Sequence, residues 1–291
     1  MSPISQWTFS LLVSTVMFFS FASHAEDKPT LPTAFRVCAD PNNLPFSHQN
    51  LSGFENKIAE LLAKDLKLPI EYTWFPQRMG FIQTTLRKWS DVKGRFECDV
   101  VMGVPQRFDM TSNTKPYYRS TYTLVYIKGR GWDDIKTPND LLQLPDARKQ
   151  QLKIGMFAPA PSVDWILKHN LINQAVSYQI MNGDPNYYAG QIIEQDLVAD
   201  KINMVFIWGP VAGYFAYKLK GQQELALLPV DSEAGIRFDF PMAVGVRRGE
   251  PEWKETIEQA LVRNKTAIHT ILTEYHIPLV PETLSTAKGE K

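Results

Sequence analysis

The sequence predicts an α/β fold made of two lobes, and three observations carry this prediction. Strands and helices alternate in two successive runs, which is typical of α/β lobes. Residues 202–219, INMVFIWGPVAGYFAYKL, indicate a strand, a tight turn and a helix in direct succession. The length of 291 residues favours two small cores over one large core.

The segment 202–219 is the most informative part of the chain. Met204 to Ile207 is an unbroken apolar run, as expected for a strand covered on both faces of a parallel sheet. Gly209 breaks the run, and Pro210 is suited to open a helix. Trp208 then lies at the carboxyl end of the strand, where ligands bind in open α/β sheets. We expect it to line a cleft by stacking; packing in the core is the alternative.

The first run of elements begins after a Pro-rich lead. Ser52 to Glu55 has the pattern of a capping box, with Ser52 as the N-cap, and predicts the start of a helix. The expected elements are, in order, a strand at 35–39, a turn-rich loop at 40–46, the helix from 52, a strand at 70–74, a helix at 81–89 and a strand at 99–103.

The second run repeats this alternation. The expected elements are a strand at 153–157, a helix at 162–168, a helix at 187–201 and the strand and helix of 202–219. A strand at 240–246 and one long helix at 252–274 follow.

The amino-terminal segment reads as a leader. Residues 9–21 form an apolar run that is too short to span a membrane. Ala22 to Ala25 follows with small residues at the −3 and −1 positions, which indicates a signal peptide over 1–25 that is cleaved after Ala25. This stretch has no Lys or Arg before the apolar run, and an uncleaved anchor is the alternative.

Composition gives no sign of a charged partner or a cofactor. The chain has 31 basic and 31 acidic residues, so its net charge favours neither nucleic acid nor an anionic membrane. The histidines are dispersed, and we expect no metal site. Nucleophile elbows, phosphate loops and dinucleotide fingerprints are absent from the sequence, so we expect no cofactor and no catalysis.

Export would permit a disulfide between Cys38 and Cys98, the two cysteines of the chain. Both fall in expected strands of the same lobe. Cys38 comes late in its strand and Cys98 begins its own, so parallel strands in register would hold them apart. A disulfide and two separate thiols therefore both stay open.

Several motifs resemble the type II periplasmic solute-binding proteins (solute-binding protein family 3). They are FRVCAD at 35–40, LPF at 44–46, GFE at 53–55, DVVMGVPQR at 99–107, KPYY at 115–118 and FPMAVGV at 240–246. The resemblance implies a two-lobed fold with a ligand cleft between the lobes. It places lobe 1 at 34–124 plus 238–281, lobe 2 at 125–237 and a flexible tail at 282–291. The chain would cross between lobes near 122–126 and 228–239.

Departures from that family argue against a free α-amino acid as the ligand. The family's Thr-Pro-Glu-Arg carboxylate clamp corresponds to Val104–Arg107, which keeps the Arg and lacks the Thr. A Gly-Thr pair in the second lobe corresponds to Ala158–Pro161, where two prolines remove amide donors. An Asp that binds the ligand's ammonium group corresponds to Trp208.

Three longer blocks resemble the quinoprotein-dehydrogenase-associated MoxJ/XoxJ proteins. They are CADPNNLPFS at 38–47, WFPQR at 74–78 and WGPVAGYFA at 208–216, and residues 238–250 fit as well. This resemblance implies a periplasmic, non-catalytic accessory factor for the maturation or activation of a PQQ-dependent methanol (alcohol) dehydrogenase, whose large subunit is a candidate partner. The alternatives are an ABC-transporter receptor for a small organic anion or aromatic solute, and an enzyme such as a prephenate-type dehydratase.

The expected cleft residues all follow strands of the two lobes. Arg107 could hold a carboxylate, or pair structurally with Asp109. Loop residues at a sheet edge could bind a ligand, or form an ordinary turn. The predicted cleft residues are Asp40, Asn42, Phe46, Arg78, Arg107 and Trp208.

Overall fold

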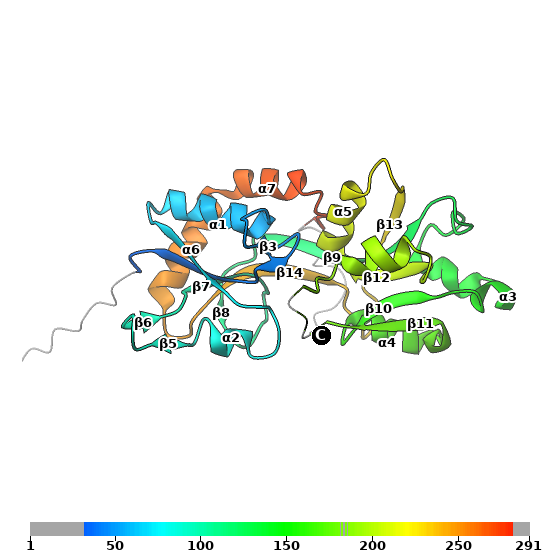
Figure 1. Ribbon diagram of the computed structural model, residues 1–291, viewed down its shortest axis with the longest axis horizontal. Coiled ribbons are helices and arrows are strands. Elements are labelled where there is room, and N and C mark those ends of the chain that lie inside the picture. The colour runs from blue at the N-terminus through cyan, green and yellow to red at the C-terminus, as the bar shows by residue number, and fades with distance from the viewer. Residues whose placement is uncertain (1–31, 181, 183, 185, 282–291) are drawn as a thin grey trace, which may run out of the picture. The chain divides into compact units, whose positions relative to one another are not determined.

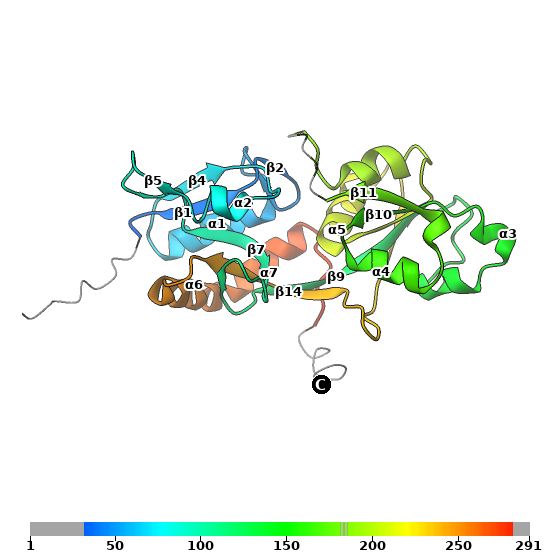
Figure 2. The ribbon, with the colours of Figure 1, turned by 90° about the horizontal axis from the view of Figure 1, so that it is seen from below.

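The computed structural model describes residues 32–180, 182, 184 and 186–281 (Figures 1 and 2). The expected leader, its cleavage site and the tail at 282–291 lie outside these residues. Among the described residues, no helix is long and apolar enough to cross a membrane.

Fourteen strands are formed in the described part of the chain. They are β1 (Phe35–Ala39), β2 (Asn42–Asn43), β3 (Ser47–His48), β4 (Ile70–Trp74), β5 (Trp89–Ser90), β6 (Arg95–Phe96), β7 (Val100–Pro105), β8 (Ser112–Asn113), β9 (Tyr118–Ile127), β10 (Ile154–Ala158), β11 (Ala175–Gln179), β12 (Met204–Trp208), β13 (Leu225–Pro229) and β14 (Asp239–Val246).

Helices alternate with these strands. The α-helices are α1 (Phe54–Asp65), α2 (Phe81–Thr84), α3 (Asp146–Lys149), α4 (Pro161–Lys168), α5 (Gly209–Lys218), α6 (Pro251–Arg263) and α7 (Lys265–Glu274). The 3-10 helices are η1 (Pro138–Gln143) and η2 (Ile172–Gln174), and η3 (Ile192–Leu197) is a π-helix.

Most strands join one sheet in the order β11-β10-β12-β9-β14-β7-β1-β4. β1 pairs in parallel with β4 and β7, and β10 pairs in parallel with β11 and β12. The long strand β9 pairs with β14 through residues 118–121 and with β12 through residues 122–126, both antiparallel. β9 therefore connects two parallel groups, which we call the first half (β1, β4, β7 and α1, α6, α7) and the second half (β10, β11, β12 and α4, α5).

Each half buries apolar side chains on both faces of its strands, because successive side chains of a strand point to opposite faces. In β12, Met204 and Phe206 join one core cluster with α4, and Val205 and Ile207 join another with α5. In Figure 1, α5 lies above β10 and β12, and α4 lies below them. The predicted buried strand at 204–207 is thus present, and its side chains are covered on both faces.

The first half follows the same rule. Phe35 and Val37 of β1 pack with α1, α6 and α7, whereas Cys38 faces a smaller cluster with Phe81 and Val101. In Figure 1, α1 and α7 lie above these strands and α2 lies below. The boundaries at 124 and 238 stay our proposal for the lobes, supported by core clusters that change near these residues.

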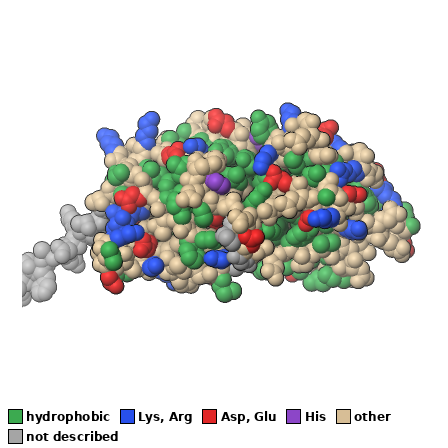
Figure 3. Space-filling model, in the orientation of Figure 1, with side chains coloured by type: hydrophobic (Ala, Val, Ile, Leu, Met, Phe, Trp, Pro, Cys, Tyr) green, Lys and Arg blue, Asp and Glu red, His purple; other side chains and the backbone are tan. Residues whose placement is uncertain are grey.

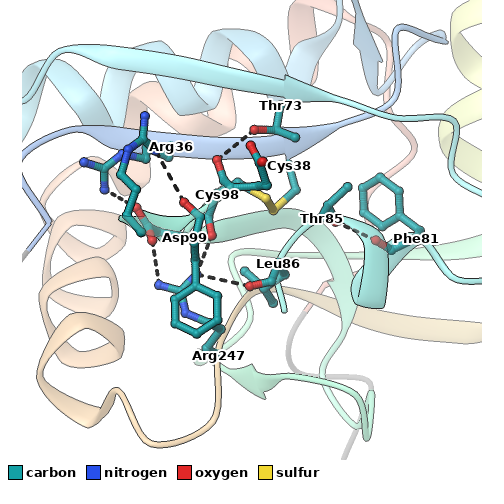
Figure 4. The surroundings of a disulfide bond; sticks show 12 residues. Arg36, Cys38, Thr73, Phe81, Thr85, Leu86, Cys98, Asp99 and Arg247 are labelled. Atoms are coloured by element: carbon teal, nitrogen blue, oxygen red, sulfur yellow. Dashed lines mark hydrogen bonds and ion pairs between the residues drawn. A yellow bond between two sulfur atoms is a disulfide. The ribbon is translucent and has the colours of Figure 1, made fainter. Parts of the chain in front are cut away.

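Cys38 and Cys98 form a disulfide, with their Cα atoms 5.4 Å apart (Figure 4). Cys98 does not begin a strand, as the sequence suggested, but precedes β7. Cys38 is opposite Val101 in the register of β1 and β7, and the chain before β7 continues beside β1, as the hydrogen bond from the Asp99 amide to the Arg36 carbonyl shows. This segment brings the two sulfur atoms together although the cysteines are not register partners.

A buried group of charges lies next to the disulfide (Figure 4). The carboxyl of Asp99 pairs with Arg247 at 2.5 Å and with Arg36 at 2.8 Å. Arg247 also donates to the carbonyl oxygens of Cys98 and Leu86. Asp99 and Arg247 are both less than a tenth exposed, and their mutual pairing keeps either charge from being buried alone.

Three expected helices differ in the structure. The helix expected at 81–89 ends at Thr84, and the hydroxyls of Thr84 and Thr85 bond to the carbonyls of the preceding turn. The helix expected at 252–274 is divided into α6 and α7 at Asn264, whose side chain donates to the Ala260 carbonyl. The helix expected at 187–201 is reduced to η3.

The start of α1 also differs from the expected capping box. Gly53, not Ser52, is the N-cap, and its N–H bonds to the side chain of Asn56 at 3.1 Å. A Cβ on Gly53 would lie 2.1 Å from the carbonyl oxygen of Phe46, so the close approach of the loop excludes a side chain. The Glu55 side chain is therefore not needed for capping.

Candidate ligand cleft

A cavity of about 490 Å³ lies at the carboxyl ends of β1, β4, β7, β10 and β12. Asp40 and Asn42 follow β1, Arg78 follows β4 and Trp208 ends β12. The size is within the range of pockets for small molecules. This is the edge at which the sequence placed a ligand.

The loop after β1 is fixed by hydrogen bonds to Asp40. One carboxylate oxygen accepts the Asn42 amide at 2.8 Å, and the other accepts the Gln77 amide at 2.5 Å. The Ser47 hydroxyl donates to the Asp40 carbonyl at 2.8 Å. Asp40 thus joins the loops after β1 and β4, which matches the turn-forming alternative for this residue.

Trp208 stands among aromatic side chains. Its ring centroid is 5.3 Å from that of Tyr122 and 6.0 Å from that of Phe240, with interplanar angles of 60° and 65°. These tilted arrangements suit the ring quadrupoles. Trp208 is half-buried, and all three side chains line the cavity, so the tryptophan serves both packing and the cleft wall.

A further part of the cavity wall comes from the second half, to which Trp208 of β12 also belongs. Phe157, Tyr187 and Tyr188 line it, and Tyr188 stacks on Phe215 with ring centroids 5.9 Å apart. Gly190 lies so close to Phe215 that an added Cβ would meet its ring at 2.1 Å. Close packing against α5 therefore positions these tyrosines.

Glu55 brings a carboxyl into the cavity from the first turn of α1. Gly103 of β7 makes room for it: a Cβ at this position would lie 1.8 Å from a Glu55 carboxylate oxygen. Gly103 also has a φ of +61°, which glycine adopts without strain. The glycine thus serves both the backbone turn and the placement of the acid.

Burial raises the pKa of the Glu55 carboxyl from 4.5 to about 8. The N-terminus of α1 acts in the other direction because its exposed N–H groups favour a negative charge. That effect is worth about 0.3–1 kcal/mol, whereas a rise of this size corresponds to roughly 5 kcal/mol. Burial therefore dominates, and the carboxyl is mostly protonated at neutral pH.

Two buried tyrosines accompany Glu55. The buried hydroxyls of Tyr117 and Tyr118 make no hydrogen bond of good geometry among the described residues, although the Gly103 backbone lies close to Tyr117 and the Trp208 side chain lies close to Tyr118. Burial, followed by the charge of Glu55, raises the pKa of both phenols well above 10, and the Trp208 side chain partly offsets this for Tyr118. Polar atoms without partners thus lie close to the acid.

The structure brings five of the six predicted cleft residues together. Asp40, Asn42, Phe46, Arg78 and Trp208 line the cavity. Arg107 is an exposed residue of the turn after β7 and is not among the lining residues. The strand-end rule locates the backbone of this turn, but Pro105 ends the strand and the arginine lies beyond it.

Sequence reasoning missed several lining residues. Tyr122 and Phe240 belong to the strands β9 and β14, which come from sequence positions far from the other lining residues. Glu55 was interpreted as part of a capping box. The signal that could have identified it is its place two residues after Gly53, in the first turn of a helix that follows the loop of β1.

The described residues contain no group of three or more His, Cys, Asp or Glu side chains arranged to hold a metal ion. On the face shown in Figure 3, acidic and basic side chains are interspersed, in keeping with the equal numbers of both in the sequence. The distinguishing features of the cleft are therefore its aromatic walls and the carboxyl of Glu55.

Comparison with known proteins identifies relatives that cover most of the chain. The periplasmic binding protein XoxJ from Methylobacterium extorquens AM1 is 31% identical, with a TM-score of 0.67 over 86% of this chain and 100% of that chain. Protein MoxJ of Paracoccus denitrificans is 28% identical over 266 residues, which cover 86% of this chain and 90% of that protein. No family model matches the sequence.

Less similar structures share the fold. MxaJ from Methlophaga aminisulfidivorans MPT is 23% identical, with a TM-score of 0.67 over 85% of this chain and all of that chain. An ancestral arginine-binding protein is 21% identical with a TM-score of 0.57, over 84% of this chain and 99% of that chain. The predicted two-lobed α/β binding-protein fold is confirmed, and the chain belongs to the family of the periplasmic binding protein XoxJ.

Proposed function

We propose that this protein is a non-catalytic periplasmic binding protein that assists a PQQ-dependent methanol (alcohol) dehydrogenase, as a maturation or activation factor. The observation that carries the proposal is the likeness to XoxJ over that protein's full length, together with the likeness to MoxJ. Three sequence blocks resemble this family, at 38–47, 74–78 and 208–216. Each of them contributes lining residues to the same cavity.

The cavity supports binding better than catalysis. Glu55 has the raised pKa expected of a general acid, which the sequence did not reveal. Acid–base catalysis usually needs a second group in a complementary state, and both carboxylate oxygens of the neighbouring Asp40 accept backbone amides. A turnover assay with prephenate tests the enzyme alternative directly, and product formation would contradict our proposal.

A deletion strain tests the accessory role. We expect dehydrogenase activity in periplasmic extract to fall when the gene is deleted and to return with the intact gene. The variant Trp208→Ala should restore less activity than the matched variant Trp89→Ala. Trp89 is 52% exposed and is not among the lining residues of the cavity, so it controls for the loss of a surface tryptophan.

Each result has a clear meaning. Normal dehydrogenase activity in the deletion strain would refute the accessory role. Affinity capture from native periplasm should retain the dehydrogenase, and we expect its large subunit among the retained chains. If Trp89→Ala, rather than Trp208→Ala, fails to complement, the partner binds the surface around β5 and not the cleft.

A transport receptor is the second candidate, and the aromatic walls favour an aromatic solute for it. A receptor for an organic anion is supported less well, because Arg107, the residue expected to bind a carboxylate, does not line the cavity. Arg78 is a lining residue and could still contact an anion. Calorimetry against a panel of solutes separates the candidates: tight, saturable binding of one transported solute, with normal dehydrogenase activity in the deletion strain, would favour the receptor.

A further inference from the structure

The Glu55 carboxyl is a polar group of the cavity whose role in the fold is not apparent. Burial alone accounts for the change in its pKa, and no Lys or Arg of the described residues neutralises it. The other lining carboxyls have structural partners: Asp40 accepts two backbone amides, and Asp184 accepts the amide of Asn186 at 2.9 Å. Glu55 is therefore available to a ligand.

The surroundings of Glu55 suit a positive charge with apolar substituents. Trp208, Tyr122 and Phe240 lie within one cavity and are tilted against one another. Aromatic faces attract cations, and tryptophan does so most strongly. Glu55 supplies a carboxyl to this cavity from the first half.

We propose that Glu55 anchors an organic cation in the cleft: its carboxylate pairs with an alkylammonium group whose carbon substituents contact Trp208, Tyr122 and Phe240. A free alkylammonium solute and a lysine side chain of a protein present the same chemistry. The proposal concerns the cavity alone and does not depend on a role with a dehydrogenase.

Proton release should accompany binding. Because the pKa of Glu55 is about 8, a cation that pairs with its carboxylate at neutral pH must displace the carboxyl proton. Burial raises the pKa of Tyr72 and of Tyr122 to about 12, so both phenols keep their protons below pH 9. The other titratable or charged side chains that face Glu55 or the cavity are Tyr117, Tyr118, Asp40, Arg78, Asp184, Tyr187 and Tyr188.

Isothermal titration calorimetry with choline and with its neutral carbon analogue 3,3-dimethylbutanol tests the proposal on the purified protein. The charge of choline is constant between pH 7 and pH 9, so a pH effect reports on the protein. We expect choline to bind more tightly than the alcohol at pH 9. Its affinity should fall about tenfold at pH 7, where about a tenth of the Glu55 carboxyls are ionised.

The variant Glu55→Gln should bind choline more weakly than the unmodified protein at pH 9 and without the pH effect, and any preference for choline over the alcohol that remains reports on the aromatic side chains. Glu60→Gln is the matched control: Glu60 lies on the same helix, pairs with Lys57 and is not a lining residue. Its affinity and pH effect should equal those of the unmodified protein. Circular dichroism melting confirms that each variant is folded, and the pH effect of the unmodified protein tests the proposal without any variant.

A second pair of probes distinguishes the source of the cation. Capped lysine (N-acetyl-lysine methylamide) is compared with capped norleucine, which has a similar chain and no charge. Preference for choline indicates a free solute, and preference for capped lysine indicates a protein segment. Equal binding of the charged and neutral members in both pairs, including no detectable binding of any, would overturn the proposal, as would unchanged choline binding by Glu55→Gln.

Discussion

The two halves of the molecule share an architecture of parallel strands between helices, but they are held together by different means. In the first half, the disulfide joins β1 to the segment before β7, and Asp99 pairs with two arginines beside it. In the second half, β10 and β12 are covered by apolar and aromatic side chains such as Trp165 and Phe215. Among the described residues, the charged side chains that are fully buried belong to the first half.

The two halves also contribute different kinds of side chain to the cleft. The half with covalent and ionic ties also fixes Asp40 and Glu55, whose positions depend on hydrogen bonds and a close glycine. The half with aromatic packing supplies Phe157, Tyr187 and Tyr188 as a broad wall. Polar specificity thus comes from the rigidly connected half, and contact area comes from the other.

The largest expected effect breaks the ionic group of the first half. Asp99→Ala removes the most buried carboxylate of this group and leaves Arg247 and Arg36 only the more exposed Glu250 and Glu71 as partners. We expect the free energy of unfolding to fall by about 3–5 kcal/mol. Urea unfolding followed by circular dichroism measures this change.

The control is Asp134→Ala, which removes the exposed partner of Arg148 and should leave the unfolding midpoint nearly unchanged. A similarly small effect of Asp99→Ala would show that the buried charges contribute little to stability. The two halves would then not differ in their dependence on ion pairs.

Removal of the disulfide should have the next largest effect. The bond closes a loop with a sequence separation of 60, and its loss frees the unfolded chain. We expect Cys38→Ser with Cys98→Ser to lower the free energy of unfolding by about 2–4 kcal/mol. Urea unfolding in the presence of dithiothreitol should give the same loss for the unmodified protein and no change for the double variant. A midpoint that reductant leaves unaltered would contradict this expectation.

The acid of the cleft should make stability depend on pH. The folded-state pKa of Glu55 is about 8 and the ordinary value is 4.5, so between these values the folded protein binds a proton that the unfolded chain has lost. Stability should therefore be complete below about pH 4.5 and decline as pH rises to about 8. We expect a loss on the order of 2 kcal/mol, below the roughly 5 kcal/mol that the two pKa values imply, because the Glu55 side chain is only half-buried and water in the cavity screens its charge.

Unfolding midpoints at about pH 5 and pH 9 measure this loss in the unmodified protein and in Glu55→Gln. The variant should lack the Glu55 contribution, and the difference between the two proteins removes the contribution of all other groups. Identical pH profiles would show that Glu55 titrates normally.

The smallest expected effect is in the second half. The Tyr178 hydroxyl donates to Asp196 at 2.8 Å at the periphery of the sheet, and Asp196 also pairs with Lys201. Tyr178→Phe should cost about 1 kcal/mol, as for a single hydrogen bond. Thermal unfolding provides the measurement, with Tyr217→Phe as the control for an exposed phenol. A loss as large as that of Asp99→Ala would show that polar ties hold both halves equally.

The sequence predicted the parts of the fold that local patterns determine. The strands at 35–39 and 204–208 and the start of α5 follow from apolar runs and from Gly209-Pro210, and the structure has them. The strand β11 was not predicted, because its residues are half-exposed and it lacks an apolar run. The division of the last helix at Asn264 depends on one side chain that bonds to its own helix, which apolar spacing does not reveal.

The candidate site was predictable where it consists of strand ends, and not where it depends on contacts between distant segments. Asp40 directly follows β1, Arg78 lies four residues after the end of β4, and Trp208 is the last residue of β12. Glu55 reaches the cavity only because Gly103, which comes from another strand, leaves space for it. Such a pairing arises from the three-dimensional packing of α1 on β7, and a pattern within one segment cannot report it.

The contact between Glu55 and Gly103 also has a consequence for reading other sequences. A side chain at the position of Gly103 would occupy the place of the carboxylate, so the two positions should change together. Homologues that carry both an acid and a glycine there should share the chemistry of this cleft, and homologues with a larger residue should have lost it. The residue types at positions 55 and 103 should therefore distinguish homologues whose cleft binds cations from homologues whose cleft does not.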